Sequence, residues 1–278
     1  EQIHGCDYSC VCSDINGSMK YLINELKAAG KTRVALYGVN TSSISDIGRV
    51  DGLFAFKDES FNKMRIFTNN GSLKNCFDEF FKKCASFDAV ICSNDFAAVS
   101  LIRNLLKIAP DELNRLKILS CAQTKLSGYY KNMLTSVNMN FEQYGKAAVF
   151  IYEKLKLHPY ISQMTLNVSW NTKPNQSSEH ASISLKSARN TDRIYSDKEL
   201  NEMITAERIL EIDSATDKTV ISCLCGGKSV TEIAAACFLT DSGVKYRIKR
   251  ILEKCRISDK SELISIVKRY LTNEVEIL

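Results

Sequence analysis

Apolar runs and amphipathic helical stripes alternate through the first 157 residues, about every 25 to 30 residues. Met19, Leu22, Ile23 and Leu26 have helical spacing, and the β-prone run 33–37 follows them. The pattern then recurs, with further apolar runs at 64–67, 88–92, 116–121, 134–137 and 166–170. Strands that alternate with helices predict a parallel sheet covered by helices on both faces. In such a sheet, ligands bind at the carboxyl ends of the strands.

The remainder of the chain has a different character. Residues 171–192 are polar and rich in Ser and Asn, which is typical of a linker or an exposed loop. Ser196 and Glu199 have the spacing of a capping box for a helix that continues to about Ile212. The patterns after that helix are helical throughout. We therefore expect three parts: an α/β domain over 1–170, a linker and connecting helix over 171–212, and an all-helical domain over 213–278.

Composition excludes several classes of protein. The longest apolar run has seven residues, whereas a membrane-spanning helix needs about 20. The first 30 residues lack the basic and apolar pattern of a secretion signal. The 11 cysteines are an odd number, and several lie inside apolar runs. This usage favours reduced thiols in the cytosol over a disulfide framework, so we expect a cytoplasmic protein without a membrane partner.

The chain also lacks the common signatures of an enzyme. Its three histidines lie at the terminus, before a proline and in the polar linker: His4, His158 and His180. None is placed for general-base work. The segment Gly226–Ser229 resembles the end of a phosphate-binding loop, but Ser222 stands where such a loop needs a glycine. The Cys-x-Cys pairs have the wrong spacing for zinc. We expect no catalytic residues, metal or cofactor.

The most specific pattern runs without a gap from Ser214 to Val267. It consists of Val220-Ile221, Leu224, Gly227, Glu232-Ile233-Ala234, Leu239 to Lys245, Ile251-Leu252, Lys254, Ile257 and Ser261-Glu262-Leu263. This pattern resembles the four-helix DNA-binding domain of LuxR-type and response-regulator transcription factors. The resemblance implies a helix-turn-helix domain and double-stranded DNA as a partner.

The residues of the expected recognition helix agree with that implication. Phe238 and Leu239 are expected to pack inward as the turn, and Thr240 is a good N-cap. Residues 240–256 hold six basic and two acidic residues, although the net charge of the whole chain is only +5. A helix of this kind fits the major groove, and its basic side chains contact phosphates. We expect base contacts from Ser242, Val244, Lys245 and Tyr246, and phosphate contacts from Thr240, Lys249 and Arg250. The alternative is an ordinary solvated basic face.

A final helix is expected from about Asp259 to Leu271, with more apolar surface than one small core needs. By the resemblance, this helix pairs two DNA-binding domains into a homodimer. The dimerisation residues would be Leu263, Ile266, Val267 and Tyr270. The alternative is that the helix only packs on its own domain.

A second set of motifs covers residues 7–170. It consists of Asp14 and Gly17 ahead of Leu22 and Leu26, then Gly30 to Gly38, Gly48-Arg49-Val50 with Gly52, Asp88 to Cys92, Asn94-Asp95 with Ala97-Ala98, and Leu134 to Gly145. Together these motifs resemble the effector-binding core of LacI/GalR-type regulators, which is similar to periplasmic sugar-binding proteins.

That second resemblance implies that Arg49, Asn94 and Asp95 line a ligand cleft. An arginine offers a fork of donors, and an asparagine both donates and accepts. Asp95 lies where a strand ends and a helix begins, so it is equally a candidate helix N-cap. The family places a sugar-binding Asp where this chain has the stretch 121–123, which contains no carboxylate. We expect Gln123 at the ligand instead, and this departure counts against a sugar.

Two further departures concern the architecture. The resemblance begins partway through the family's fold, so the first lobe is expected to be incomplete. The DNA-binding domain is C-terminal here, whereas LacI-type proteins carry theirs at the N-terminus, so their hinge-helix mechanism does not transfer.

The two resemblances together favour a bacterial, homodimeric transcription regulator that binds DNA and responds to a small-molecule effector in its α/β domain. Two alternatives remain. The α/β domain could serve as a dimerisation or partner-binding scaffold without a ligand. The chain could also be a solute-binding or signalling protein whose helical tail binds protein.

Overall fold

The computed structural model describes residues 8–56, 58–170 and 197–272. The chain divides into two compact units. The first, called the α/β unit below, comprises residues 1–123 and 131–192. The second, the helical unit, comprises residues 193–278 together with the short segment 124–130. The polar stretch expected as a linker over 171–192 lies outside the described residues.

The α/β unit is built on a five-stranded sheet in which every pairing is parallel. The strand order is β3-β2-β4-β5-β6. The strands are β2 (Arg33–Val39), β3 (Lys63–Thr68), β4 (Ala89–Cys92), β5 (Lys117–Ala122) and β6 (Thr135–Asn138). The parallel sheet predicted from the alternation of strands and helices is therefore confirmed.

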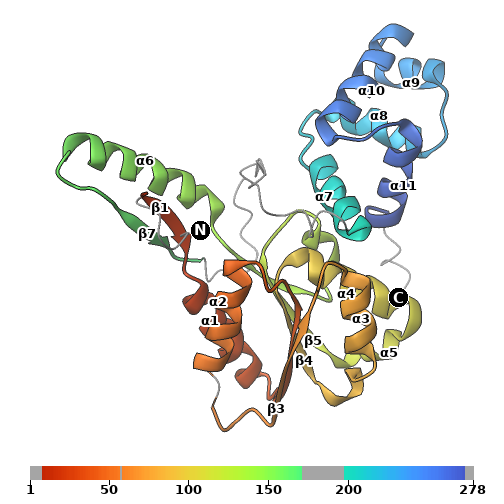
Figure 1. Ribbon diagram of the computed structural model, residues 1–278. Coiled ribbons are helices and arrows are strands. Elements are labelled where there is room, and N and C mark those ends of the chain that lie inside the picture. Colours follow the sequence, from red (N-terminus) through yellow and green to blue (C-terminus); the bar gives the residue numbers. More distant parts are fainter. Residues whose placement is uncertain (1–7, 57, 171–196, 273–278) are drawn as a thin grey trace. The chain divides into compact units, whose positions relative to one another are not determined.

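Helices cover both faces of this sheet (Figure 1). One face carries α1 (Ile15–Ala28) and α2 (Ile44–Ala55). The other carries α3 (Leu73–Phe81), α4 (Asp95–Ile108) and α5 (Pro110–Arg115). The predicted apolar stripe of α1 is buried against the sheet, since Met19, Leu22, Ile23 and Leu26 are at most 1% exposed. Removing these side chains from water is the main force that holds the layers together.

A second, smaller sheet lies in the same unit. Strand β1 (Cys10–Ser13) pairs in parallel with β7 (Thr165–Val168), with Cys10 opposite Thr165. Helix α6 (Phe141–Leu157) packs on both strands (Figure 1). The pairing joins residues that are far apart in the sequence. In the described residues this sheet has only two strands.

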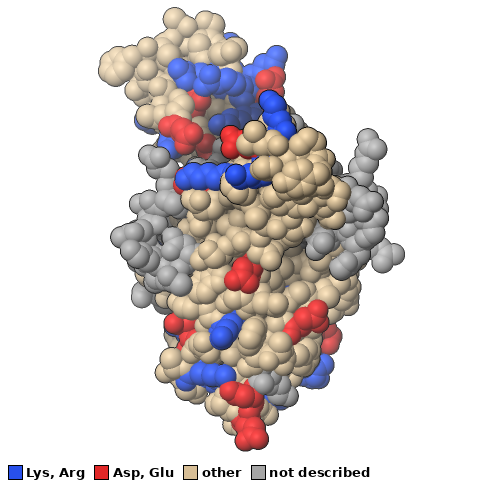
Figure 2. All heavy atoms as spheres, turned by 90° about the vertical axis from the view of Figure 1, so that its left-hand side faces the viewer, with Lys and Arg blue, Asp and Glu red and all other residues tan. Residues whose placement is uncertain are grey.

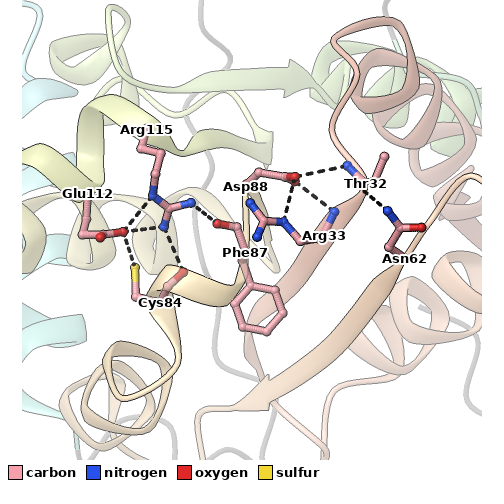
Figure 3. Close-up of polar contacts among 8 residues, drawn as sticks. All are labelled: Thr32, Arg33, Asn62, Cys84, Phe87, Asp88, Glu112 and Arg115. Carbon is pink, nitrogen blue, oxygen red and sulfur yellow. Dashed lines mark hydrogen bonds and ion pairs between the residues drawn. The ribbon is translucent and has the colours of Figure 1, made fainter.

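Polar contacts fix the amino ends of the main strands (Figure 3). The Asp88 carboxylate, just before β4, accepts hydrogen bonds from the backbone N–H of Arg33 at 3.0 Å and of Thr32 at 3.4 Å. Nearby, Arg115 pairs with Glu112 and donates to the Cys84 carbonyl oxygen at 3.0 Å. These contacts hold neighbouring strands and loops together at the amino ends of the strands. The carboxyl ends of the strands lie on the opposite side of the sheet.

In its described residues the helical unit contains five α-helices: α7 (Lys198–Leu210), α8 (Ala215–Cys225), α9 (Val230–Cys237), α10 (Asp241–Cys255) and α11 (Lys260–Tyr270). Ser196, the first residue of the predicted capping box, lies outside the described residues. Asp197 is the N-cap of α7, and its Oδ1 accepts from the backbone N–H of Glu199 at 2.9 Å. A carboxylate one residue later thus satisfies free N–H groups of the first turn.

The described residues contain ten cysteines, and all are free thiols. Seven are buried, among them Cys92 and Cys223, which lie inside apolar runs of the sequence. Within the same residues, no three His, Cys, Asp or Glu side chains lie close enough to hold a metal ion. None of the described helices is both long and apolar enough to cross a membrane.

Candidate nucleic-acid interface and candidate ligand site

A helix-turn-helix joins α9 to α10. Helix α9 begins with a capping box between Ser229 and Glu232 and ends at Phe238, whose backbone is left-handed with φ 54°. Thr240 is the N-cap of α10, and its Oγ1 accepts from the Gly243 N–H at 3.1 Å, as predicted. The expectation that Phe238 packs inward is wrong, because its side chain is 96% exposed. No pattern in the sequence indicates this exposed ring beside the start of α10.

Helix α10 has one buried and one exposed face. Val244, Ile248, Ile251 and Cys255 are all at most 2% exposed. The predicted base contact of Val244 is therefore wrong, because a period of about 3.6 residues places it in the core with Ile248 and Ile251. The opposite side presents side chains that the structure leaves exposed to solvent: Ser242, Lys245, Tyr246, Lys249 and Arg250. Thr240, at the start of the helix, is also exposed.

Lysines line a groove beside α10. The groove has a volume of about 320 Å³, and apolar side chains that include Ile248 and Leu252 line it. Lys245, Lys249 and Lys260 line it as well, together with one carboxylate, Glu253. Figure 2 shows Lys and Arg side chains gathered on the helical unit. A row of ammonium groups beside an exposed helix face is suited to the phosphates of a duplex.

A buried carboxylate holds α10 against α8. Asp217 on α8 has a side chain only 6% exposed, and it accepts from Arg247 at 2.7 Å and from Arg250 at 2.5 Å. Burial raises the pKa of Asp217, but the hydrogen bonds from the two guanidinium groups outweigh that effect, so the pKa is lowered. Arg250 is half exposed. The phosphate contact of Arg250 stays a prediction, because its Nη2 already donates a hydrogen bond to Asp217.

This carboxylate predicts a pH dependence of stability. Because the pKa of Asp217 is lowered in the folded protein, its contribution to stability is fully present above the unfolded pKa, about 3.8. The contribution is lost as the pH falls through the lower pKa of the folded state. The free energy of unfolding of Asp217→Asn should therefore lack this part of the loss below about pH 4. Between about pH 5 and about pH 7, the difference in the free energy of unfolding between Asp217→Asn and wild type should stay constant. Urea unfolding at each pH provides the measurement, and a difference that keeps changing at neutral pH would contradict this assignment.

Helix α11 is mostly inside its own unit. Leu263, Ile266 and Tyr270 are at most 4% exposed, and the Tyr270 hydroxyl donates to Glu202 of α7 at 3.0 Å. Their prediction as dimerisation residues is therefore wrong, because their surface is already used against α7 and α8. Val267 is only partly buried, and its role in a dimer stays a prediction.

The second candidate site lies at the carboxyl ends of the main strands. Gly38, near the end of β2, has φ 79°, and a Cβ there would lie 2.6 Å from the Ala97 Cβ of α4. Only glycine allows this close approach. Strand β2 has β3 on one side and β4 on the other, so the order of the chain reverses beside it. In open parallel sheets, ligands bind at such a switch point.

Arg49 lies in a buried polar cluster near this edge. Its Nη1 donates to Asp46 at 2.7 Å, and the two side chains are 11% and 7% exposed. Asp46 also accepts from the Asn40 backbone N–H at 2.9 Å. Burial raises the pKa of the Cys121 thiol to about 11, an effect that the charge of Arg49 partly offsets. Among the described residues, Arg49 Nε and Asn40 Nδ2 are buried donors without a hydrogen-bond partner.

The neighbouring candidates make contacts within the protein. Asn94 is the N-cap of α4, and its Oδ1 accepts from the Ala97 N–H at 2.9 Å. Asp95 is therefore not the cap, and the alternative stated for it is wrong. Asp95 is 1% exposed, and one of its oxygens accepts from Ser120 at 2.5 Å and from Ser136 at 2.6 Å. Gln123 lies at the end of β5 with φ 54° and donates its backbone N–H to Ser136 at 2.9 Å.

Comparison with known proteins identifies the helical unit. Residues 214–267 match the family described as bacterial regulatory proteins, luxR family. A search of curated proteins gave no match for the chain.

Solved structures share the fold of the α/β unit. An uncharacterized protein from Actinobacillus succinogenes has 21% identity and a TM-score of 0.53, over 64% of this chain and 68% of that one. The Lac repressor bound to ONPG has 16% identity and a TM-score of 0.51, over 58% and 50%. A periplasmic binding ribose operon repressor protein from Lactobacillus acidophilus has 17% identity and a TM-score of 0.50, over 60% and 62%. The match thus spans half to about two thirds of these chains.

These findings show what each unit is similar to. The helical unit carries a LuxR-type helix-turn-helix, and the α/β unit has the periplasmic-binding-like fold of LacI-type regulators. The chain thus joins a region that matches the luxR family, at its C-terminal side, to a unit that shares its fold with the Lac repressor.

Proposed function

We propose that the chain acts as a homodimer, binds duplex DNA through the exposed face of α10, and changes its DNA affinity when a small molecule binds at the carboxyl ends of the α/β strands. It acts without catalysis, in the bacterial cytoplasm where its DNA lies. The observation that carries the DNA part is the exposure of Lys245, Tyr246 and Lys249 on one side of a capped helix. The recognition helix of such domains enters the major groove.

The ligand part rests on the two buried donors, Arg49 Nε and Asn40 Nδ2. A buried donor without an acceptor costs free energy, about 1–3 kcal/mol. A ligand that supplies acceptor oxygens would recover that cost. The carboxylate of Asp95 already accepts from two serine hydroxyls, and the stretch 121–123 contributes no carboxylate. We therefore propose a small ligand rich in acceptors, such as a carboxylate or phosphate ester, rather than a neutral sugar.

Salt dependence tests the DNA part. We expect the full chain to bind a random duplex of about 20 bp at low salt, with an affinity that falls steeply as salt is added. Lys249→Ala should reduce the slope of log K against log salt by about 1, because one phosphate contact is lost. Fluorescence anisotropy at several salt concentrations measures the slope. Lys20→Ala, which removes an equal charge from an exposed position on α1, is the matched control. An identical slope for Lys249→Ala and wild type would count against the phosphate contact.

Thermal shift tests the ligand part. A panel of small carboxylates, phosphate esters and sugars is screened for compounds that raise the melting temperature of the full chain. For any stabilising compound, we expect Arg49→Lys to weaken binding about tenfold or more, since lysine keeps a charge but lacks the fork of donors. Arg65→Lys, at an exposed position on β3, is the control. If no compound stabilises the protein while DNA binding is intact, the ligand-free scaffold is the better account of the α/β unit.

A further inference from the structure

The helical unit contains a segment that the sequence places in the middle of the α/β part. Residues Thr124–Tyr130 group with α7 to α11 rather than with the sheet. The segment begins directly after Gln123 and includes a short 3-10 turn, Ser127–Tyr130. It is well packed, because Leu126, Ser127 and Tyr130 are at most 4% exposed.

One carboxylate on α7 holds this segment. Glu207 accepts the Lys125 backbone N–H at 2.8 Å through one oxygen and the Leu126 backbone N–H at 2.7 Å through the other. The Lys125 ammonium also donates to the Leu210 carbonyl oxygen, at 3.4 Å. Hydrogen bonds to an ionised carboxylate are shorter and stronger than neutral ones. We call Glu207, Lys125 and Leu126 the clamp.

The residues that precede the clamp are conformationally strained. Ala122 has φ 141° and Gln123 has φ 54°, values that residues with a Cβ seldom adopt. The Gln123 N–H is held by Ser136, which donates in turn to buried Asp95. Hydrogen bonds thus connect the strained backbone to the residues at the carboxyl ends of β4, β5 and β6. In the chain, only Thr124 separates this backbone from Lys125, the first residue of the clamp.

The clamp helix is itself part of the DNA-binding body. Helix α7 packs against α11 and α10. Glu202, on the same helix, accepts from the Tyr270 hydroxyl at 3.0 Å and pairs with Arg269. A displacement of α7 would therefore be felt by the recognition helix through packed side chains, as coupling between sites requires.

We infer that the clamp is the regulatory connection between the ligand edge of the sheet and the DNA-binding helices. This inference rests on the proposed function. A change in the hydrogen bond between Ser136 and Gln123 alters the backbone conformation at 122–123. Because only Thr124 separates this backbone from the clamp, the change reaches Glu207 and α7. Each ligand state at the carboxyl ends of the strands therefore favours one conformation of the helical unit.

A double-mutant cycle tests the clamp without a ligand or DNA. Ser136→Ala removes the hydroxyl that holds Gln123, and Glu207→Gln weakens the clamp. Amide hydrogen exchange in α7 is measured in the full chain for wild type, both single variants and the pair. We expect Ser136→Ala to change exchange rates in α7 at least about fivefold in the wild-type background and less than about twofold in the Glu207→Gln background. Equal changes in both backgrounds, or no change in wild type, would overturn the inference.

Two further variants make the test specific. Glu202→Gln loses a carboxylate on the same helix that bonds α11 instead of the segment, so the effect of Ser136→Ala should persist in it. Gln123→Gly relaxes the left-handed backbone and replaces Ser136→Ala should that variant fail to fold.

The affinity for a random duplex of about 20 bp at low salt is then measured for the same cycle. A change in affinity upon Ser136→Ala that disappears with Glu207→Gln supports a regulatory clamp. Coupled exchange with unchanged affinity would overturn its regulatory role while leaving DNA binding intact. Failure of the wild-type chain to bind DNA would instead sink the proposed function, whatever the exchange data show.

Discussion

Replacing Asp217 with alanine is expected to lower the free energy of unfolding of the helical unit by about 2–3 kcal/mol. Removing one partner of a buried ion pair usually costs about 3–5 kcal/mol. The lower value applies here because Arg247 and Arg250 are 27% and 50% exposed and can regain water. For a unit of this size the melting temperature should fall by about 10 °C or more. Thermal unfolding followed by circular dichroism measures the change.

The control for this variant is Asp213→Ala. Asp213 is exposed and carries the same charge, so its loss should change the melting temperature little. DNA affinity should fall in Asp217→Ala as well, because Asp217 holds two arginines of the recognition helix against α8. If Asp217→Ala melts like Asp213→Ala, the buried pair contributes nothing to stability and this account of α10 is wrong.

Replacing Lys245 with alanine is expected to weaken DNA binding by about 5- to 150-fold, which corresponds to about 1–3 kcal/mol for a contact in the groove. Lys245 lies in the second turn of α10, near the capped end that enters the major groove in helix-turn-helix proteins. Its side chain is exposed, so the melting temperature should be nearly unchanged. Affinity is measured by anisotropy with a fixed duplex and salt concentration.

Lys20→Ala again serves as the charge-matched control for Lys245→Ala. A loss of affinity in both variants to the same extent would mean that only net charge matters. Full affinity in Lys245→Ala would show that the exposed face of α10 does not meet the groove, and the proposed DNA interface would fail.

Local patterns are enough to find most of the architecture. The stripe of Met19, Leu22, Ile23 and Leu26 forms a helix with those residues buried, because helical periodicity and burial are properties of a short segment. The N-cap of α10 is predictable for the same reason, since Thr240 bonds an N–H only three residues away. Helical periodicity predicts which side chains of the recognition helix face DNA better than their distance from its start does. Val244 lies near the start, where a contact with DNA is expected, but its spacing from Ile248 places its side chain in the core.

The candidate sites are predictable only in part. The sequence indicates Arg49 as a ligand residue, but its pairing with Asp46 and its unpartnered Nε depend on how α2 packs. The burial of Tyr270 depends on α7, whose Glu202 lies 68 positions earlier in the chain. An apolar stripe on a helix predicts that its surface will be buried, but it does not predict which element buries it.

The amino-acid sequence by itself determined the parallel sheet, the helix-turn-helix and the positive charge of α10, because each follows from residues that are close neighbours in the chain. The tertiary structure alone decided that Asp217 binds two arginines of α10 and that Glu207 receives the backbone of Lys125 and Leu126. Those bonds join residues 30 to 82 positions apart. No local pattern encodes such a contact, because its geometry exists only after the elements between the two residues have packed.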